Sequence, residues 1–202
     1  ILVARQGLGV TSLNDILQIA KERPGKLKFH GINERSIHML EFKSLIAETD
    51  IQLHSVKPDG GSEGAIDAIK TGKVDLTITT GPRLLEGIRL KEFAAIAAIS
   101  DQRTPFYPEI PTMKELGLNT IGGGSWTGLF APKGVSNTIL EEIFEATINA
   151  SQKSSVIQKL SAQAASIDLN NSLEDALTFV KNETERLRQA CIVANFSQEF
   201  TN

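Results

Sequence analysis

Residues 51–79, with the sequence IQLHSVKPDGGSEGAIDAIKTGKVDLTIT, contain the pattern that indicates the fold. Residues 51–56 alternate in polarity and 74–79 are rich in β-compatible side chains, so each run predicts a strand. Between them, a Pro-Asp-Gly-Gly turn leads to Ser62, which we expect to cap a helix with apolar residues at helical spacing. The stretch therefore predicts a strand–helix–strand unit.

The same alternation extends upstream to the first residue. Strands are predicted at 1–4 and 27–30, and a helix follows each of them. The first of these helices is expected to begin after Ser12 and to end at Pro24. Short connections between alternating strands and helices predict an α/β fold with a parallel sheet covered by helices.

The regular alternation of predicted strands and helices ends after residue 100. The segment 101–111 contains three prolines and cannot be regular throughout. Beyond it we predict a short helix at 112–116, a strand at 126–131, and helices from Asn137, around 156–160 and from Ser172. The change suggests two lobes, residues 1–97 and 98–202, and paired α/β lobes bind small ligands in the crevice between them.

Composition excludes several classes of protein. Of the 202 residues, 41% are hydrophobic and 22% are charged, which is ordinary for a globular protein. The net charge of -3 comes without a basic cluster, which argues against nucleic-acid binding, and no apolar run is long enough to span a membrane. The single cysteine, Cys191, cannot form an internal disulfide, and we expect a buried structural thiol.

Two turns that connect a strand to a helix are candidates for binding an anion. Gly60 and Gly61 precede Ser62, and free amides at a helix start attract carboxylates, although a plain tight turn is the alternative. In the turn at 31–36, we expect Ser36 to cap a helix, and Asn33 and Arg35 could hydrogen-bond a ligand. Glu34 works against an anion there because it adds negative charge.

Thr79 and Thr80 complete the predicted site because they end a strand at the same edge. Their hydroxyls could contact a ligand, whereas ordinary strand packing is the alternative for β-branched residues. Thr77 lies further into the strand, so ligand contact is less expected there.

The motifs of other chemistries are missing from the sequence. No G-x-x-x-x-G-K-[ST] loop is present, so we expect no nucleotide and no cofactor. His30, His38 and His54 lack the spacing of a helical metal pair, and Ser125 is not in a G-x-S-x-G elbow. The sequence therefore predicts neither a metal site nor an enzyme.

Five segments, in order along the chain, resemble the receptors of tripartite tricarboxylate transporters, the Bug family. They are Pro24-Gly25-Lys26-Leu27, Gly60-Gly61, Gly72-Lys73-Val74-Asp75-Leu76, Pro108-Glu109-Ile110-Pro111-Thr112-Met113-Lys114-Glu115-Leu116-Gly117 and Ser125-Trp126-Thr127-Gly128-Leu129-Phe130-Ala131-Pro132-Lys133-Gly134. The resemblance runs from about Leu2 to Phe196 and is most specific in the last two segments.

The resemblance implies a type 2 periplasmic-binding fold that closes on a small carboxylate, often through bridging waters, and delivers it to a membrane permease in the periplasm. Residues 1–97 would form domain 2 and carry the ligand contacts, and 98–202 would form the C-terminal part of domain 1. Family members also carry an N-terminal segment with a glycine-rich ligand loop. Since Ile1 is not preceded by a signal peptide or a methionine, we expect that segment to be missing here.

Three positions depart from the family pattern. Members usually have a loop of small residues where this chain has Asn33-Glu34-Arg35, and Tyr-Lys where it has Pro58-Asp59. They often have an acidic residue in place of Thr79. We therefore expect an altered ligand set, without a partner for the ammonium group of an amino acid.

Three alternatives to a passive receptor stay open at this point. The fold class also suits the effector-binding domain of a transcriptional regulator, which a helix-turn-helix in the complete gene would indicate. An enzyme on the same scaffold is disfavoured because no nucleophile and base can be named. The altered turns are also compatible with a diverged paralogue that has no transport ligand.

Overall fold

The computed structural model describes residues 1–31, 34, 36–57, 60–118 and 124–196. The chain divides into two compact units. Unit 1 comprises Ile1–Gly124 with Arg188–Asn202, and unit 2 comprises Ser125–Leu187. The expected division into 1–97 and 98–202 concerns the lobes of a complete receptor, and it stays a prediction.

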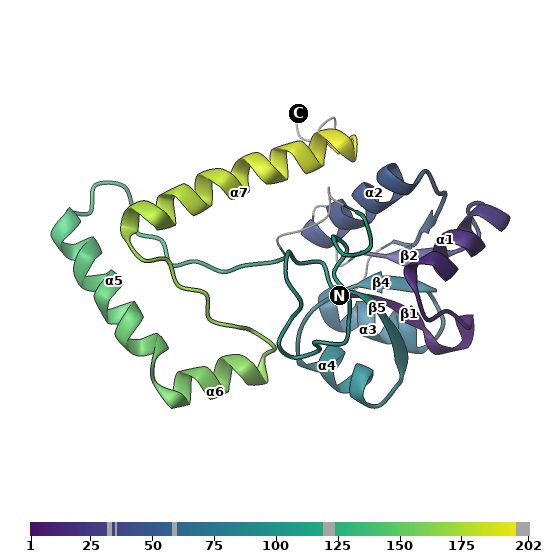
Figure 1. The fold of residues 1–202 in the computed structure, drawn as a ribbon, viewed down its shortest axis with the longest axis horizontal. Coiled ribbons are helices and arrows are strands. Elements are labelled where there is room, and N and C mark those ends of the chain that lie inside the picture. Colours follow the sequence, from purple (N-terminus) through teal and green to yellow (C-terminus); the bar gives the residue numbers. More distant parts are fainter. Residues whose placement is uncertain (32–33, 35, 58–59, 119–123, 197–202) are drawn as a thin grey trace. The chain divides into compact units, whose positions relative to one another are not determined.

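Unit 1 is built on a mixed five-stranded sheet with the strand order β3-β2-β4-β1-β5 (Figure 1). The strands are β1 (Leu2–Arg5), β2 (Lys28–His30), β3 (His54–Ser55), β4 (Leu76–Ile78) and β5 (Phe93–Ala97). Strands β1 to β4 overlap runs that the sequence pattern predicts as strands, whereas β5 was not predicted. The alternation of strands and helices confirms the α/β class.

The prediction of an all-parallel sheet is wrong for β1. Strand β2 is parallel to β3 and β4, but β1 is antiparallel to both β4 and β5. Leu2, Val3 and Ala4 are completely buried, and a strand with two buried faces has no residue pattern that encodes its direction. Pairing in the folded molecule decides that direction.

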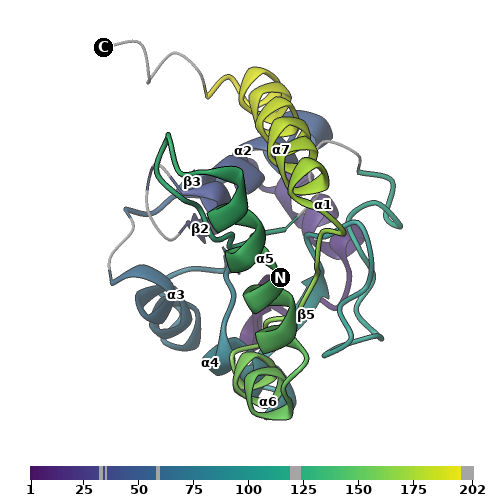
Figure 2. The same ribbon diagram turned by 90° about the vertical axis from the view of Figure 1, so that its left-hand side faces the viewer.

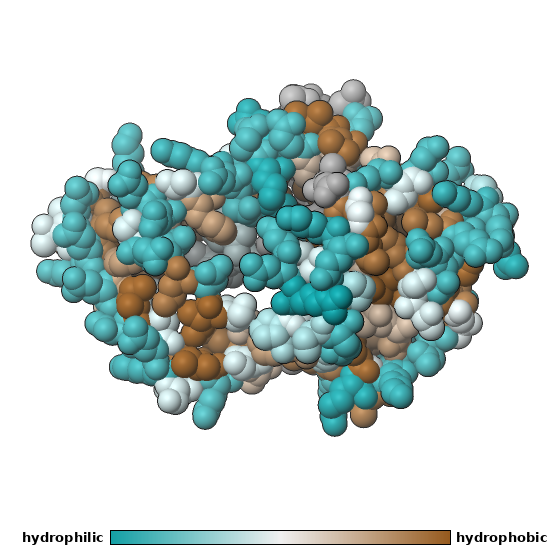
Figure 3. Space-filling view, in the orientation of Figure 1, coloured by the Kyte–Doolittle hydropathy of each residue, from teal (hydrophilic) through white to brown (hydrophobic). Residues whose placement is uncertain are grey.

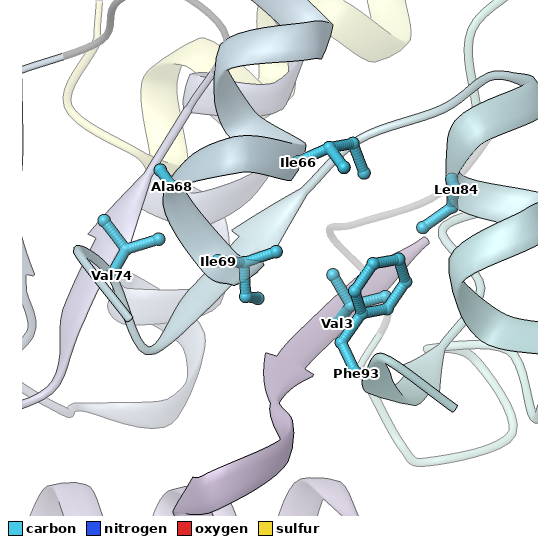
Figure 4. Close-up of a cluster of buried hydrophobic side chains, with 7 residues drawn as sticks. All are labelled: Val3, Ile66, Ala68, Ile69, Val74, Leu84 and Phe93. Carbon is cyan, nitrogen blue, oxygen red and sulfur yellow. The ribbon is translucent and has the colours of Figure 1, made fainter. Parts of the chain in front are cut away.

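Four α-helices cover the two faces of this sheet (Figures 1 and 2). They are α1 (Leu13–Glu22), α2 (Ile37–Thr49), α3 (Gly61–Lys70) and α4 (Pro82–Arg89), and a short 3-10 helix, Gln6–Leu8, follows β1. On one face, α3 and α4 bury the apolar cluster of Figure 4: Val3, Ile66, Ala68, Ile69, Val74, Leu84 and Phe93. On the other face, Phe42 of α2 packs on Phe29 of β2, with 4.5 Å between ring centroids.

Helix α1 begins as the sequence predicts. Ser12 is its N-cap: the Asp15 amide donates to the Ser12 hydroxyl at 3.2 Å, and the Asp15 carboxylate accepts from the Ser12 amide at 2.9 Å. Hydrogen bonds from the Thr11 amide and from Ser12 lower the pKa of Asp15. This reciprocal capping box satisfies amides that the first helical turn leaves unbonded.

The predicted helix at 112–116 is a single capped turn. The Glu115 amide donates to the Thr112 hydroxyl at 3.1 Å, and the Thr112 amide donates to the Glu115 carboxylate at 2.8 Å. Arg103 also donates to Glu115, at 3.0 Å. Thr112 and Glu115 therefore cap the turn reciprocally, and the turn ends at Gly117. The φ of Gly117 is 86°, a positive value that glycine adopts without strain.

Unit 2 contains α5 (Asn137–Ser151), α6 (Ser154–Ala162) and α7 (Leu173–Val193) up to Leu187, which confirms the three predicted helices. The strand predicted at 126–131 is not formed, because no strand in the described part of the chain pairs with it. Neither α5 nor α6 has a buried residue, and apolar surface shows over both helices in Figure 3.

Candidate ligand-binding site

The predicted site lies in unit 1, at the edge of the sheet where β2 and β4 end. Because these strands are neighbours and parallel, His30 at the end of β2 and Ile78 at the end of β4 reach the same edge. Helices α2, α3 and α4 begin shortly after β2, β3 and β4, respectively. Of the predicted residues, Asn33 and Arg35 lie outside the described residues, so their positions stay predictions.

Thr79 and Thr80 differ in exposure. Thr79 is completely buried, and its backbone extends the β1–β4 pairing: the Ile1 nitrogen donates to its carbonyl at 2.9 Å, and its amide donates to the Ile1 carbonyl at 3.2 Å. The Thr79 hydroxyl has no hydrogen-bond partner among the described residues, although an unpaired buried hydroxyl is costly. Thr80 is exposed at the same edge.

Ser36 is the N-cap of α2, as predicted. Its hydroxyl accepts from the Met39 amide at 3.2 Å, and its carbonyl accepts from the amides of Met39 and Leu40 at 3.1 Å. Gly31, at the start of the same turn, is buried against Met39, whose Cα would lie 3.2 Å from any added Cβ. The turn is therefore held against α2 at both ends.

Ser62 does not cap α3, contrary to the prediction. Gly60 is the N-cap and Gly61 the first helical residue, both in the left-handed region with φ of 71° and 61°. Two glycines can adopt this conformation without strain, so the helix starts before Ser62. Gly60 has no side chain that could accept a hydrogen bond from the amides of the first turn.

Sequence reasoning missed the ion pairs that join α3 to α4. Arg83, in the first turn of α4, donates to Glu63 and to Asp67 of α3, the latter at 2.7 Å. A free Glu63 carboxylate would repel an anion at the start of α3. Its ion pair with Arg83 reduces that repulsion. The i,i+4 spacing places Glu63 and Asp67 on one face of the helix and is a signal for a shared cation. The sequence does not indicate which cation, because Arg83 is distant along the chain.

The three histidines, which the sequence predicts to be structural or surface residues, differ in exposure. His30 and His38 are buried, and His54 is exposed. Burial, and to a lesser extent the amino group of Ile1, lower the pKa of His38 to about 4. In the described part of the chain, no three His, Cys, Asp or Glu residues are grouped as a metal site would require.

Two surface hollows, of about 500 and 310 Å³, are lined only by residues of unit 2, whereas the predicted ligand residues belong to unit 1. They share Leu169. The larger is bordered by Phe144, Glu145, Ile148, Asn149, Asn170 and Asn171 as well. None of the lining residues is buried, so neither hollow has the enclosed polar groups that orient a ligand.

The motifs behind the resemblance have structural roles here. Asp75 accepts from Arg5 at 2.7 Å and from the Lys28 amide at 2.9 Å, which ties β1 and β2 to the start of β4. In unit 2, Trp126 packs edge-on against Phe179 at 5.1 Å and donates to Glu183 at 3.0 Å. These contacts therefore stabilise the fold within each unit.

A family model for the tripartite tricarboxylate transporter family receptor matches residues 1–195. The chain belongs to this family. The family is described as the receptors of this transporter. Among the described helices, none combines the length and apolarity of a membrane-crossing segment.

Curated relatives include a UPF0065 protein of Pseudomonas sp. strain P51, 30% identical over 182 residues, and BugT of Bordetella pertussis, 29% identical over 167 residues. They match 89% and 82% of this receptor-family chain, respectively. These matches cover 53% and 50% of the relatives, so the chain spans about half the length of the curated relatives it matches.

Solved structures share the fold. An R. palustris protein solved with adipate superposes with a TM-score of 0.82 at 24% identity, over 96% of this chain and 64% of its own. MatC of Rhodopseudomonas palustris, solved with bound malate, has a TM-score of 0.76 at 22% identity, over 96% of this chain and 65% of its own. The type 2 periplasmic-binding fold is thus confirmed over the part of these structures that the chain matches.

Proposed function

We propose that this protein is part of a periplasmic solute-binding receptor that holds a small carboxylate and delivers it to the membrane permease of a tripartite tricarboxylate-type transporter. The observation that carries the proposal is the family match over residues 1–195. The adipate and malate bound by two proteins of the same fold support a carboxylate as the ligand.

Binding at the sheet edge would use neutral donors together with one charged group, the guanidinium of Arg35. The amides of Gly60, Gly61 and Ser62 open α3, and its positive helix dipole favours a carboxylate oxygen there. Thr79 and Thr80 would donate from the end of β4, with Asn33, Arg35 and Ser36 contributing from the preceding turn. Residues 1–97 would form this ligand lobe, and 98–202 would belong to the second lobe.

The receptor would act by binding alone, without catalysis. Interactions with the carboxylate stabilise a closed arrangement of the lobes, and the permease would recognise that state. A buried hydroxyl such as that of Thr79 contributes more to affinity than an exposed one, because no water competes for it. An effector domain of a regulator, or a paralogue without a ligand, would not require the permease.

Calorimetry and thermal unfolding with malate, adipate and citrate test the proposal. A ligand at about 100 times its Kd stabilises the native state by about 2.7 kcal/mol, so Tm must rise with the right acid. Replacing Thr80 by Ala should weaken binding, whereas the same change at Thr147, an exposed threonine of unit 2, should not. If none of the acids raises Tm or releases heat, the paralogue without a ligand is favoured.

A further inference from the structure

We propose that Thr77 is a positioning residue that holds the ends of β2 and β4, and thereby the two ligand segments that follow them, in one arrangement. Thr77 itself is completely buried in β4 and is not expected to touch the ligand. The inference deepens the proposed function, because its effect on affinity rests on that function. Its effect on the protein can be measured without any ligand.

The contact that carries the inference joins two neighbouring strands. The Thr77 hydroxyl donates to the carbonyl of His30 at 2.8 Å, and both residues are buried. His30 and Thr77 form the last paired position of β2 and β4. The hydroxyl therefore adds a bond where two three-residue strands are about to separate, the place where short strands open most easily.

The chain beyond His30 has little room to move independently. Gly31 follows immediately, and an added Cβ there would lie 3.0 Å from the Met39 side chain and 3.2 Å from its Cα. Ser36 then caps α2 through the amide of the same Met39. A shift of the His30 carbonyl is therefore transmitted to Gly31 and to the start of α2.

The other strand is equally constrained on its far side. Two residues after Thr77, the backbone of Thr79 is paired with Ile1 in both directions. The Thr77 hydroxyl thus connects a strand end fixed by β1 to a strand end packed on α2. Without this bond, the ligand-binding residues predicted in the 31–36 turn could shift relative to Thr79 and Thr80.

Two substitutions separate this role from a general loss of stability. Thr77→Val keeps the shape and loses the hydroxyl, whereas Thr77→Ser keeps the hydroxyl and loses a buried methyl group, so both should lower Tm. With malate, adipate and citrate, Thr77→Val should raise the Kd of the best ligand about tenfold, since a buried hydrogen bond is lost, while Thr77→Ser should stay within about threefold. Equal affinities in the two variants would overturn the inference.

Thr71→Val is the matched control. The Thr71 hydroxyl also donates to a backbone carbonyl, that of Asp67 at 2.7 Å, but at the opposite end of α3 from the predicted site. Its loss should leave Kd unchanged. A rise in Kd equal to that of Thr77→Val would show that any lost threonine hydroxyl weakens binding, and it would contradict a specific role for Thr77.

If the unmodified protein binds none of the acids, the proposed function is rejected but the role of Thr77 is not. Hydrogen exchange then tests the role of Thr77 without a ligand. Amides within 29–31 and 36–40 should exchange about tenfold faster in Thr77→Val than in Thr77→Ser, because the strand ends open more often. Amides of α1 should not differ between the variants. Indistinguishable exchange at the strand ends would overturn the inference whatever the ligand results.

Discussion

Gly87 shows how one missing side chain fixes the contact between α4 and the sheet. A Cβ at this position would lie 2.2 Å from Cζ of Phe93, which is part of the buried cluster of unit 1. The helix therefore approaches β5 as closely as it does because residue 87 is glycine.

Replacing Gly87 by Ala should destabilise the protein although alanine is the better helix former. Overpacking costs about 1–3 kcal/mol, whereas the gain in helix propensity is about 1 kcal/mol. We expect urea unfolding to show a net loss of up to about 2 kcal/mol. The loss should shrink in a Phe93→Leu background, and a variant as stable as the parent would contradict the close contact.

His38 should make stability depend on pH. Its pKa falls from 6.5 to about 4 in the folded protein, chiefly through burial, so the unfolded chain binds more protons between these values. The stabilisation is complete above pH 6.5 and is lost as the pH falls toward 4. By linkage, about 2 kcal/mol should be lost between pH 8 and pH 5.

Chemical denaturation of the parent and of His38→Gln at these two pH values measures this contribution. The variant should lose less stability on acidification, since glutamine does not titrate. An NMR titration of His38 should give a midpoint well below that of a free histidine. Identical pH dependence in the two proteins would refute the assignment to His38.

At the scale of the element, Tyr107 anchors the proline-rich segment to α4. Its hydroxyl donates to the carbonyl of Leu85 at 2.7 Å, and burial raises its pKa, with the charge of Glu109 adding to the shift. Three prolines leave residues 101–111 with few backbone bonds of their own. A side-chain bond to a helix can therefore decide where this segment lies.

Tyr107→Phe should lower the free energy of unfolding by about 1 kcal/mol, the usual contribution of one such bond. Limited proteolysis should also cut 101–111 faster in the variant, because the segment is released from α4. Glu109→Gln changes an exposed neighbour that takes no part in this bond, and it serves as the control. Unchanged cleavage in Tyr107→Phe would show that the prolines alone hold the segment.

Elements with local signals were predictable from the sequence. Ser12 and Asp15 form the capping box of α1, and an apolar run followed by polar residues marks β4. The direction of β1 was not predictable, because its apolar residues are buried on both sides and direction depends on distant partners. The strand expected at 126–131 failed for a related reason: an apolar run forms a strand only where a neighbour can pair with it.

The candidate site likewise contains features that local sequence predicts and contacts that it does not predict. The glycine pair at the start of α3 and the threonines after β4 are short motifs where a strand is followed by a helix, so local sequence indicates them. The bond from Thr77 to His30 spans 47 residues, and the pair between Arg83 and Glu63 spans 20. Such contacts exist only once the sheet and helices are assembled, and no local pattern encodes them.

At the scale of the whole molecule, the two units differ in the amount of core they contain. Unit 1 has a sheet with helices on both faces and a cluster of fully buried side chains. In unit 2, Leu129 is 74% exposed, Phe130 67% and Leu177 63%. Contacts such as that of Trp126 with Phe179 contribute, but they bury little of the helices.

Hydrogen exchange across the chain should therefore show two levels of protection. Local opening costs less where few apolar groups are buried, so amides in the centres of α5 and α6 should exchange faster than those in α1 and α2. The comparison is internal to one sample, which removes differences in solution conditions. Equal protection of α5 and α2 would mean that the exposed apolar residues of unit 2 are covered in solution. Sedimentation at two protein concentrations would then establish whether a second copy of the chain covers them, because self-association strengthens with concentration.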